Sequence, residues 1–216
     1  MSRMYETGVS KCYLYPLDST VQSGTPYVNG VAWSGITSIS ESPSGADITT
    51  LYADNIKYAQ LQAAEEFGAT VEAYTYPEEF AACDGSAELT TGATFGQQSR
   101  KMFGLCYRTE YRDGETSGEY YKLHLIYGLN AKPSERAYET INDSPDAITF
   151  SWEMSATPVT FTDGAITYST SVITIDSKTA NKNGLTALET KLYGNGADKK
   201  PELPLPEEVK TTLAAV

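Results

Sequence analysis

The residues that could bind a metal ion or act as nucleophiles are few and far apart. The chain has one histidine, His124, and three cysteines, Cys12, Cys83 and Cys106. A zinc site needs about four ligands, usually with two of them close together as in CxxC, and no such pair exists in the sequence. The pattern therefore argues against a zinc site. It predicts that the cysteines are small buried hydrophobic residues in a reducing compartment.

The single histidine lies in an alternating segment, between Leu123 and Leu125 and on the face opposite to these two leucines. A catalytic histidine needs a nucleophile or a carboxylate that it can contact, and none stands at the spacing of a known family. We therefore predict that His124 is a structural or surface residue.

The acidic pairs do not form a recognisable acid–base site. Glu65 and Glu66, like Glu78 and Glu79, are adjacent in sequence, and adjacent side chains do not converge on one substrate. The segment 112–118 (RDGETSG) has the composition of a calcium loop but lacks its alternating oxygen ligands. The segment GATFG lacks the ending of a phosphate-binding loop. The sequence thus predicts no catalytic, cofactor-binding or metal site, and a hydrolase with a carboxylate pair is the alternative.

The charge of the chain is acidic and unevenly distributed. Its 216 residues include 16 Lys and Arg against 28 Asp and Glu, a net charge of −12. Residues 178–216 contain six lysines and five acids, so residues 1–177 carry a net charge of −13. Binding to nucleic acids or anionic membranes needs a cationic face, so both are disfavoured as main activities. The N-terminus lacks the apolar core of a signal peptide, which predicts synthesis and folding in a cytoplasm.

Two long alternating segments predict the central element of the fold. Large apolar or aromatic residues occupy every second position over 103–111, with the exception of Thr109, and again over 121–127, with turn-forming residues at 113–118 between them. A third alternating segment follows at 147–156 and contains Trp152. Three such strands can form an antiparallel sheet with one buried face. We expect Trp152 to be buried in a central strand and the other face of the sheet to be wet.

The remaining segments complete a mainly β fold class. Strands are expected over 9–17, 31–40 and 65–76 and in two pieces around Asp163 and Gly164, whereas 85–100 is expected to be a loop. Short helices are expected from Pro77, over 184–194 and from Pro206. The pattern predicts a β domain over residues 1–177 and a helical, Pro-rich extension over 178–216 that packs on it or extends from it.

Residues 46–64 have no obvious place in the core of a monomer. They can form a hairpin around Asp54 and Asn55, but the two strands are too polar to be a domain core and too rich in Ile, Tyr and Thr to be disordered. A plain surface hairpin is one interpretation. The other is a protruding arm that becomes ordered on assembly and contacts another subunit. The candidate interface residues are Ile48, Leu51, Tyr52, Ile56 and Tyr58.

Several long strings of the sequence resemble one protein family. They are GQQSRKMFGLCYRTE, YYKLHLIYG, SERAYETINDSPDAITFSWEMSATPV, LYADNIKYAQLQAAEEFGATVEAYTYPEEFAACDGSAE and LTALETKLYG. Together they look like the major tail protein, or tail tube protein, of long-tailed bacteriophages and prophages of Gram-positive bacteria. The resemblance covers residues 1–213 and is carried by these long strings, since no short motif defines it. The Pro-rich C-terminal tail departs from the simplest version of the pattern.

The resemblance implies a structural virion protein made in the host bacterial cytoplasm. It implies a tail-tube-type β-sandwich or barrel of two packed antiparallel sheets with a flanking short α-helix. It implies homo-hexameric rings that stack into the tail tube, through which DNA passes without specific binding. The implied partners are other copies of the chain, the tape measure protein and the tail terminator and distal tail proteins. It implies no enzyme activity, no cofactor and no membrane.

A conduit for DNA should carry acidic side chains on its inner wall, because carboxylates repel phosphates. The candidates are Glu110, Glu119 and Glu153, which we expect to point away from Tyr107, Leu123 and Trp152. Two other functions stay open. The 16 tyrosines could stack on sugars in a carbohydrate-binding or adhesin β-sandwich of a phage tail tip. The chain could also be the inner tube protein of a contractile tail or of a phage-like bacteriocin particle.

Overall fold

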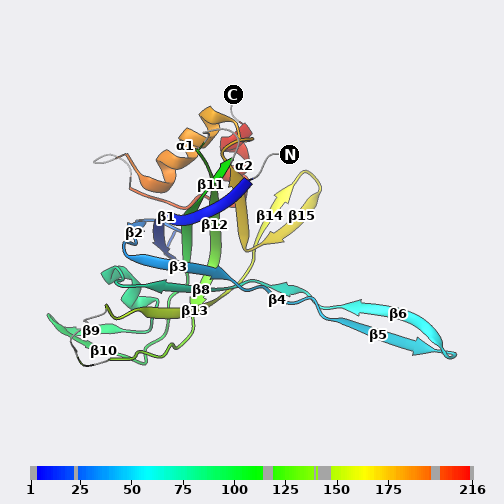
Figure 1. Ribbon diagram of the computed structural model, residues 1–216, viewed down its shortest axis with the longest axis horizontal. Helices are drawn as coiled ribbons and strands as arrows, with labels where there is room; N and C mark the ends of the chain where they lie inside the picture. The colour runs from blue at the N-terminus through cyan, green and yellow to red at the C-terminus, as the bar shows by residue number, and fades with distance from the viewer. Residues whose placement is uncertain are drawn as a thin grey trace.

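A computed structural model describes residues 4–21, 24–113, 119–138, 140, 147–195 and 200–214. The protein is mainly β, with antiparallel strand pairing and two α-helices among these residues, which confirms the expected fold class. Neither helix is long and apolar enough to span a membrane. Figure 1 shows a body with the helices at one end and a thin arm that leaves it near the other end.

The largest sheet of the described residues has eight strands in the order β2-β1-β11-β12-β13-β8-β3, and β16 also pairs with β12. It coils so far that β1 contacts β3. The expected hairpin is confirmed as β11 and β12, although residues 114–118 of its turn lie outside the described part. The strands are β1 (Met4–Pro16), β2 (Val31–Ala32), β3 (Ile36–Glu41), β8 (Gly68–Ala73), β11 (Phe103–Asp113), β12 (Glu119–Ala131), β13 (Phe150–Ala156) and β16 (Val172–Asp176).

The concave side of this coiled sheet holds the first of two cores, which we call the interior core. Trp152 is 1% exposed, and its position inside the sheet, between β12 and β8, confirms the prediction that it is buried in a central strand. Its ring contacts Trp33 at 5.5 Å and Phe80 at 5.2 Å between centroids. Phe80 comes from the 3-10 helix η1 (Glu78–Ala82), which confirms the short helix expected after Pro77.

The second core lies on the other face of the same strands, the face that the sequence analysis expects to be wet. There Leu123 and Leu125 of β12 pack against Leu188, in a helix-side core formed with α1 (Lys182–Tyr193) and α2 (Pro206–Ala214). The strand register pairs Tyr107 with His124 and Arg108 with Leu123, so Tyr107 and Leu123 point to opposite faces. The prediction of one buried and one wet face is therefore wrong for the central hairpin, because the C-terminal extension covers the second face.

Gly128 stands where β12 changes its pairing partner from β16 to β13. Residues 122–126 pair with β16, whereas residues 129–131 pair with β13. Gly128 has a φ of 63°, and a Cβ at this position would collide with the carbonyl oxygen of Thr157, whose N–H donates to the Gly128 carbonyl at 2.8 Å. Only glycine tolerates this close approach. Beyond it the side chains change face: Tyr127 lies in the helix-side core and Leu129 in the interior core.

The remaining strands form small hairpins outside the large sheet. The segment 85–100, expected to be a loop, contains β9 (Ala87–Thr90) and β10 (Ala93–Phe95). The two expected strand pieces around Asp163 and Gly164 are confirmed as β14 (Val159–Asp163) and β15 (Ile166–Thr170). The arm is built by the four strands not yet described. They are β4 (Ser44–Gly45), β5 (Ile48–Ala53), β6 (Ile56–Gln62) and β7 (Glu65–Glu66).

Candidate functional site

The most conspicuous surface feature is the arm, defined here as residues 44–66. It continues strands β3 and β8 outward as a two-stranded ribbon, first through β4 and β7 and then through β5 and β6 (Figure 1). Backbone bonds bridge the irregular joints, with Ser42 donating to Gly68 at 2.8 Å and Ala63 to Asp47 at 3.1 Å. At about 3.3 Å per residue, the six residues of β5 span about 20 Å.

The tip of the arm is the turn that the sequence predicts. Asp54 has a φ of 51° and Asn55 a φ of 60°, so both residues are left-handed, as a type I′ turn requires. Asn and Asp tolerate this conformation better than other residues with side chains, because their short polar groups bond locally. The turn fixes the register of β5 against β6, and the register decides which side chains share a face.

The register divides the arm into two unlike faces. Directly opposed residues point to the same side of a hairpin. Leu51 lies opposite Ala59 and Ala53 opposite Ile56, and Leu61 falls on the same side. The apolar arm face therefore consists of Thr49, Leu51, Ala53, Ile56, Ala59 and Leu61, with Thr49, opposite Leu61, as its one polar member. The polar arm face consists of Ile48, Thr50, Tyr52, Lys57, Gln60 and Gln62.

The five candidate interface residues all lie on the arm and are all exposed. Leu51 and Ile56 are on the apolar arm face, whereas Ile48 and Tyr52 are on the polar one. Tyr58 is the extra residue at a bulge between these pairs and is 74% exposed. Leu61, 57% exposed, belongs to the apolar arm face but is missing from the predicted set. Its place follows from the bulge, which alternation in the sequence does not reveal.

A small, partly buried polar cluster holds the root of the arm. Glu41, the last residue of β3, accepts a hydrogen bond from the Tyr107 hydroxyl. The His124 ring stacks on the Tyr107 ring at 4.7 Å, and its Nδ1 lies 3.6 Å from Glu41 Oε1. The other ring nitrogen is 3.0 Å from the Thr109 hydroxyl oxygen. The side chain of His124 is only 12% exposed, so it has a structural place here and is not a surface residue.

Burial sets the protonation state of this cluster. It lowers the pKa of His124, and the nearby Glu41 carboxylate opposes that shift only in part. Burial raises the pKa of Tyr107, and the hydrogen bond to Glu41 raises it further. At neutral pH the imidazole is therefore neutral and the phenol protonated. The cluster can orient the start of the arm without a buried positive charge.

Each of the three candidate lumen acids has a cationic neighbour. Glu110 lies 3.2 Å from Arg108 and Glu119 lies 2.8 Å from Arg112, while Glu153 pairs with Lys132. The register places Glu110 and Glu119 on one face of the central hairpin. Glu153 projects from β13 near the opposite end of β12. The structure therefore does not bring the three acids together within one subunit.

The expected direction is wrong for two of these acids, because Glu110 lies opposite Tyr121 and therefore shares the face of Leu123, as Glu119 does. Glu119 and Leu123 are four residues apart in a strand without a register shift between them, so they share a face. Leu123 faces the helix-side core, and the exposed Glu119 lies beyond the edge of that core. Glu153 does point away from Trp152, its neighbour in β13, as expected.

The groups with intrinsic reactivity are buried or scattered. Cys12, Cys83 and Cys106 are free and buried, as expected. Burial raises the pKa of Cys83 and of Cys106 to about 12, so both are thiols at neutral pH. Within the described ranges, no three or more His, Cys, Asp or Glu side chains are grouped so that they could hold a metal ion.

Comparison with known proteins adds no further assignment. No protein-family model matches the chain, and no curated protein matches it.

Proposed function

We propose that this protein is the structural subunit of a bacteriophage tail tube. In this proposal six copies form a ring, the rings stack into a tube, and DNA passes through the tube during ejection. The ring number, the virion location and the partners, namely the tape measure, tail terminator and distal tail proteins, rest on the sequence resemblance. The finer fold description, a tail-tube-type sandwich or barrel, is part of the same proposal.

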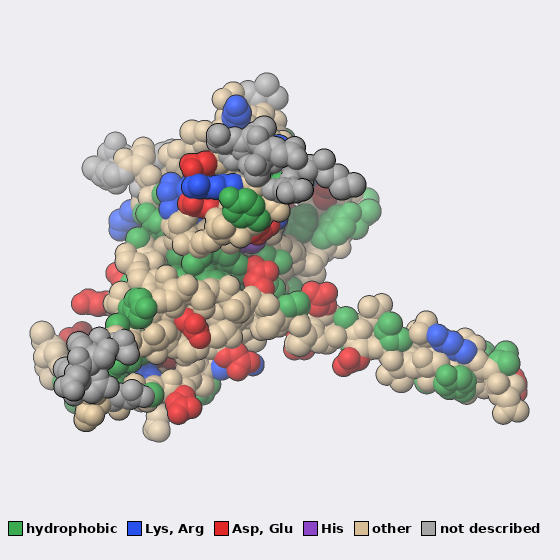
Figure 2. Space-filling view, in the orientation of Figure 1, with side chains coloured by type: hydrophobic (Ala, Val, Ile, Leu, Met, Phe, Trp, Pro, Cys, Tyr) green, Lys and Arg blue, Asp and Glu red, His purple; other side chains and the backbone are tan. Residues whose placement is uncertain are grey.

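The observation that carries the proposal is the arm. A hairpin without a covering layer is marginally stable in water, and soluble monomers rarely leave a contiguous apolar surface exposed. The arm presents Leu51, Ile56 and Leu61 on one face and Tyr52 on the other, all of them exposed. Figure 2 shows hydrophobic side chains spaced along it in green. Such a surface suits a partner, and a protruding element suits a repeating head-to-tail contact between copies.

The charge of the chain agrees with a conduit. The acid excess lies entirely in residues 1–177, which contain the large sheet and the arm. A wall with excess carboxylates repels phosphates and keeps passing DNA from adhering. Glu110, Glu119 and Glu153 are the candidate wall residues, although the cation beside each acid weakens its field.

The proposal is tested by self-assembly of the purified protein. We expect a monomer in dilute solution and rings or tubes in concentrated or seeded solution, seen by negative-stain electron microscopy. A variant in which residues 48–60 are replaced by a short Gly-Ser turn should remain a folded monomer that does not polymerise. Monomers alone at millimolar concentration would refute the proposal, whereas normal tubes from the arm deletion would show that the arm is not the stacking element.

Two controls separate the alternatives. Binding of the monomer to a glycan array, abolished by Tyr52→Ala and Tyr58→Ala, would support the carbohydrate-binding interpretation instead. Both tyrosines lie on the arm, are more than 70% exposed and could stack on a sugar ring. Recovery of a sheath protein with tubes from the native particle would identify a contractile tail or a bacteriocin particle.

A further inference from the structure

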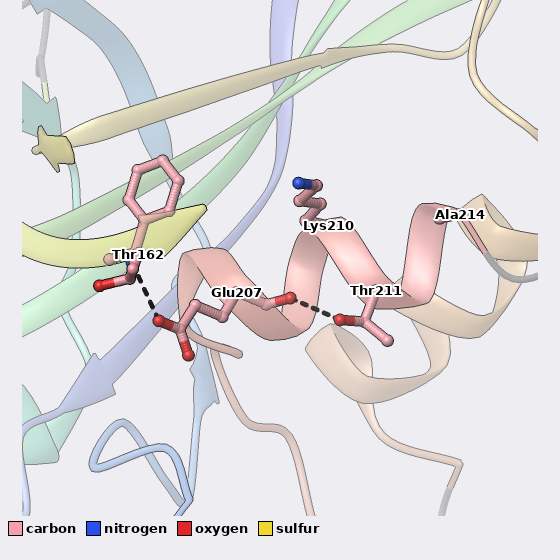
Figure 3. A pocket seen from close by; sticks show the side chains of 6 residues that line it. Thr162, Glu207, Lys210, Thr211 and Ala214 are labelled. Atoms are coloured by element: carbon pink, nitrogen blue, oxygen red, sulfur yellow. Dashed lines mark hydrogen bonds between the residues drawn. The ribbon is translucent and has the colours of Figure 1, made fainter. Parts of the chain in front are cut away.

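The β14–β15 hairpin and the arm are held to the body in different ways. Figure 3 shows Thr162 of β14 facing α2, where its N–H donates to the Glu207 carboxylate at 3.0 Å. Lys210 of the same helix pairs with Asp163 at the end of that hairpin. The β14–β15 hairpin is therefore anchored to a helix by a hydrogen bond and an ion pair, whereas the arm extends away from both helices (Figure 1).

The arm is connected to the body through irregular backbone. Strand β3 ends at Glu41 and strand β4 begins at Ser44, so the ribbon is interrupted before the arm starts. Gly45 and Ala46 follow with φ angles of 83° and 55°, and the left-handed conformation is uncommon for alanine. Hinges usually consist of a few residues at the ends of regular elements. Residues 42–46 are therefore the place where the arm can change its direction relative to the body.

The Glu41 side chain joins this hinge to the polar cluster of the body. Its Oε1 accepts the hydrogen bond of the Tyr107 hydroxyl, and the same oxygen lies 3.6 Å from Nδ1 of His124. Two groups thus converge on one carboxylate oxygen. Of the two, the imidazole is the group that changes its charge near neutral pH, and His124 is the one histidine of the chain.

We propose that His124 is a proton switch for the arm: protonation of its ring holds Glu41 more tightly, fixes the direction of the arm and thereby promotes assembly. The inference rests on the proposed function, in which the arm contacts a second copy. A neutral imidazole carries a proton on one nitrogen, whereas the imidazolium carries one on each. Nδ1 then donates to Glu41, while Nε2 keeps its contact with the Thr109 hydroxyl at 3.0 Å.

Protonation should move Glu41 and leave the ring in place. A charge-assisted N–H···O bond is about 2.7–2.9 Å long, so the distance of 3.6 Å should shorten by about 0.7–0.9 Å. The His124 side chain is 12% exposed and its ring stacks on that of Tyr107, whereas the Glu41 side chain is 38% exposed. The carboxylate at the hinge is therefore the partner that moves, and its movement restricts the start of the arm.

A restricted arm binds a second copy at a lower entropic cost. An arm that samples several directions loses that freedom on binding, and the loss reduces the affinity. Protonation of His124 should therefore favour the contact between copies, and by linkage the contact should favour the protonated ring. The pKa of His124 should then be higher in tubes than in monomers, so assembly should strengthen as the pH falls.

The surroundings of His124 set the pH range of the switch. The nearest charged or titratable side chains on its face of the sheet are Tyr107 and Tyr111 of β11, Lys122 of its own strand, Asp176 of β16, Glu6 of β1 and Glu41 of β3. Burial is the largest influence and lowers the pKa of His124. Glu41 and Glu6 oppose that shift, whereas Lys122 adds to it. The switch therefore acts below about pH 6.5, the ordinary pKa of histidine.

The first test uses the monomer, before any assembly. All three native cysteines are buried, so spin labels attach to introduced cysteines. Lys57→Cys on the arm and Ala187→Cys on α1 are both exposed, and pulsed electron paramagnetic resonance gives the distribution of distances between the two labels. From about pH 7.5 to about pH 5 this distribution should narrow in the labelled chain, and it should stay broad when His124→Asn or Glu41→Gln is added. The control pair, Thr167→Cys with Ala187→Cys, reports the anchored hairpin and should give the same distribution throughout.

The second test measures assembly over the same pH range. The concentration at which rings or tubes appear should fall about threefold or more in the wild-type chain, as a pKa about 0.5 higher in the tube requires. Nuclear magnetic resonance of the single imidazole gives the pKa in the monomer. His124→Asn and Glu41→Gln should lose this pH dependence. Glu6→Gln is the matched control, because it removes a carboxylate that also raises the pKa of His124 but lies on β1, and it should keep the response.

The outcomes separate this inference from the proposed function. An unchanged distance distribution in the chain with native His124, or equal narrowing in His124→Asn, would overturn the switch and leave the tube subunit standing. The same pH dependence of assembly in wild type and His124→Asn would overturn it as well. If no rings or tubes form at any pH, the proposed function falls, and the promotion of assembly falls with it. Narrowing that needs both His124 and Glu41, with a matching loss of pH-dependent assembly in their variants, establishes the switch.

Discussion

The two faces of the arm make a sharp prediction about assembly. Replacing Leu51, Ile56 and Leu61 by threonine removes the large apolar groups from the apolar arm face while keeping residues that favour strands. These side chains are 42%, 66% and 57% exposed in the subunit. Full burial of such a side chain contributes about 1.5–3 kcal/mol, so covering the exposed fractions contributes about 2.5–5 kcal/mol per contact in total. The triple variant should therefore weaken the contact about sixtyfold or more.

Sedimentation velocity over a concentration series measures this effect as a shift in the concentration at which material larger than monomer appears. The free energy of unfolding of the monomer should change little, because surface substitutions usually alter it by less than about 0.5 kcal/mol. The matched control is Ile48→Thr with Tyr52→Thr, the same chemistry on the polar arm face. If this control blocks assembly and the triple variant does not, the division of the arm into faces is refuted.

Three further predictions concern the body. Trp152→Ala should lower the free energy of unfolding by about 3–5 kcal/mol, which is a large part of the stability of a domain. Trp152→Phe should lower it by less in the same denaturation assay. Equal losses of stability in the two variants would contradict the burial of Trp152 in the interior core. Because burial lowers the pKa of His124, the unfolded chain binds more protons below the ordinary value of 6.5, so stability should fall as the pH drops through that value. This slope, measured by chemical denaturation, should shrink in His124→Asn, and an unchanged slope would exclude the histidine as its source. Glu153→Lys would place a second cation beside Lys132. If β13 faces the lumen, tubes of this variant should form but eject DNA slowly at low salt, and ejection should recover at high salt. Normal ejection at low salt would show that Glu153 does not line the lumen.

The sequence predicted the elements whose signals are local. Alternation over the central hairpin found β11 and β12, and the pair Asp54 and Asn55 found the arm tip, because each pattern reports the conformation of its own residues. Trp152 was placed correctly for the same reason. The hairpin β9–β10 was missed, because its strands of four and three residues carry no clear alternation.

The errors concern relations between distant segments. A covered second face of β12 depends on α1 and α2, which follow more than 50 residues later, and nothing within β12 announces them. Alternation divides the side chains of a strand between two faces but does not show how many of these faces are covered. When only one covered face is assumed, the apolar residues Tyr107 and Leu123 are assigned to the same face, whereas the register places them on opposite faces. In the arm, the bulge at Tyr58 shifts the strand register, so Leu61 joins Leu51 on the apolar arm face only once the pairing is known.

The charge of the subunit bears on when the arm finds its partner. At a net charge of −12, copies repel each other over distances that the apolar contact does not reach, and this repulsion favours monomers in dilute solution. Salt at physiological strength shortens electrostatic reach to about 8 Å, which screens the repulsion between bodies more than the attraction between surfaces in contact. Raising the ionic strength from low values should therefore lower the concentration needed for assembly of the wild-type chain. The opposite trend in sedimentation velocity would mean that charge pairing, and not the apolar arm face, provides most of the contact free energy.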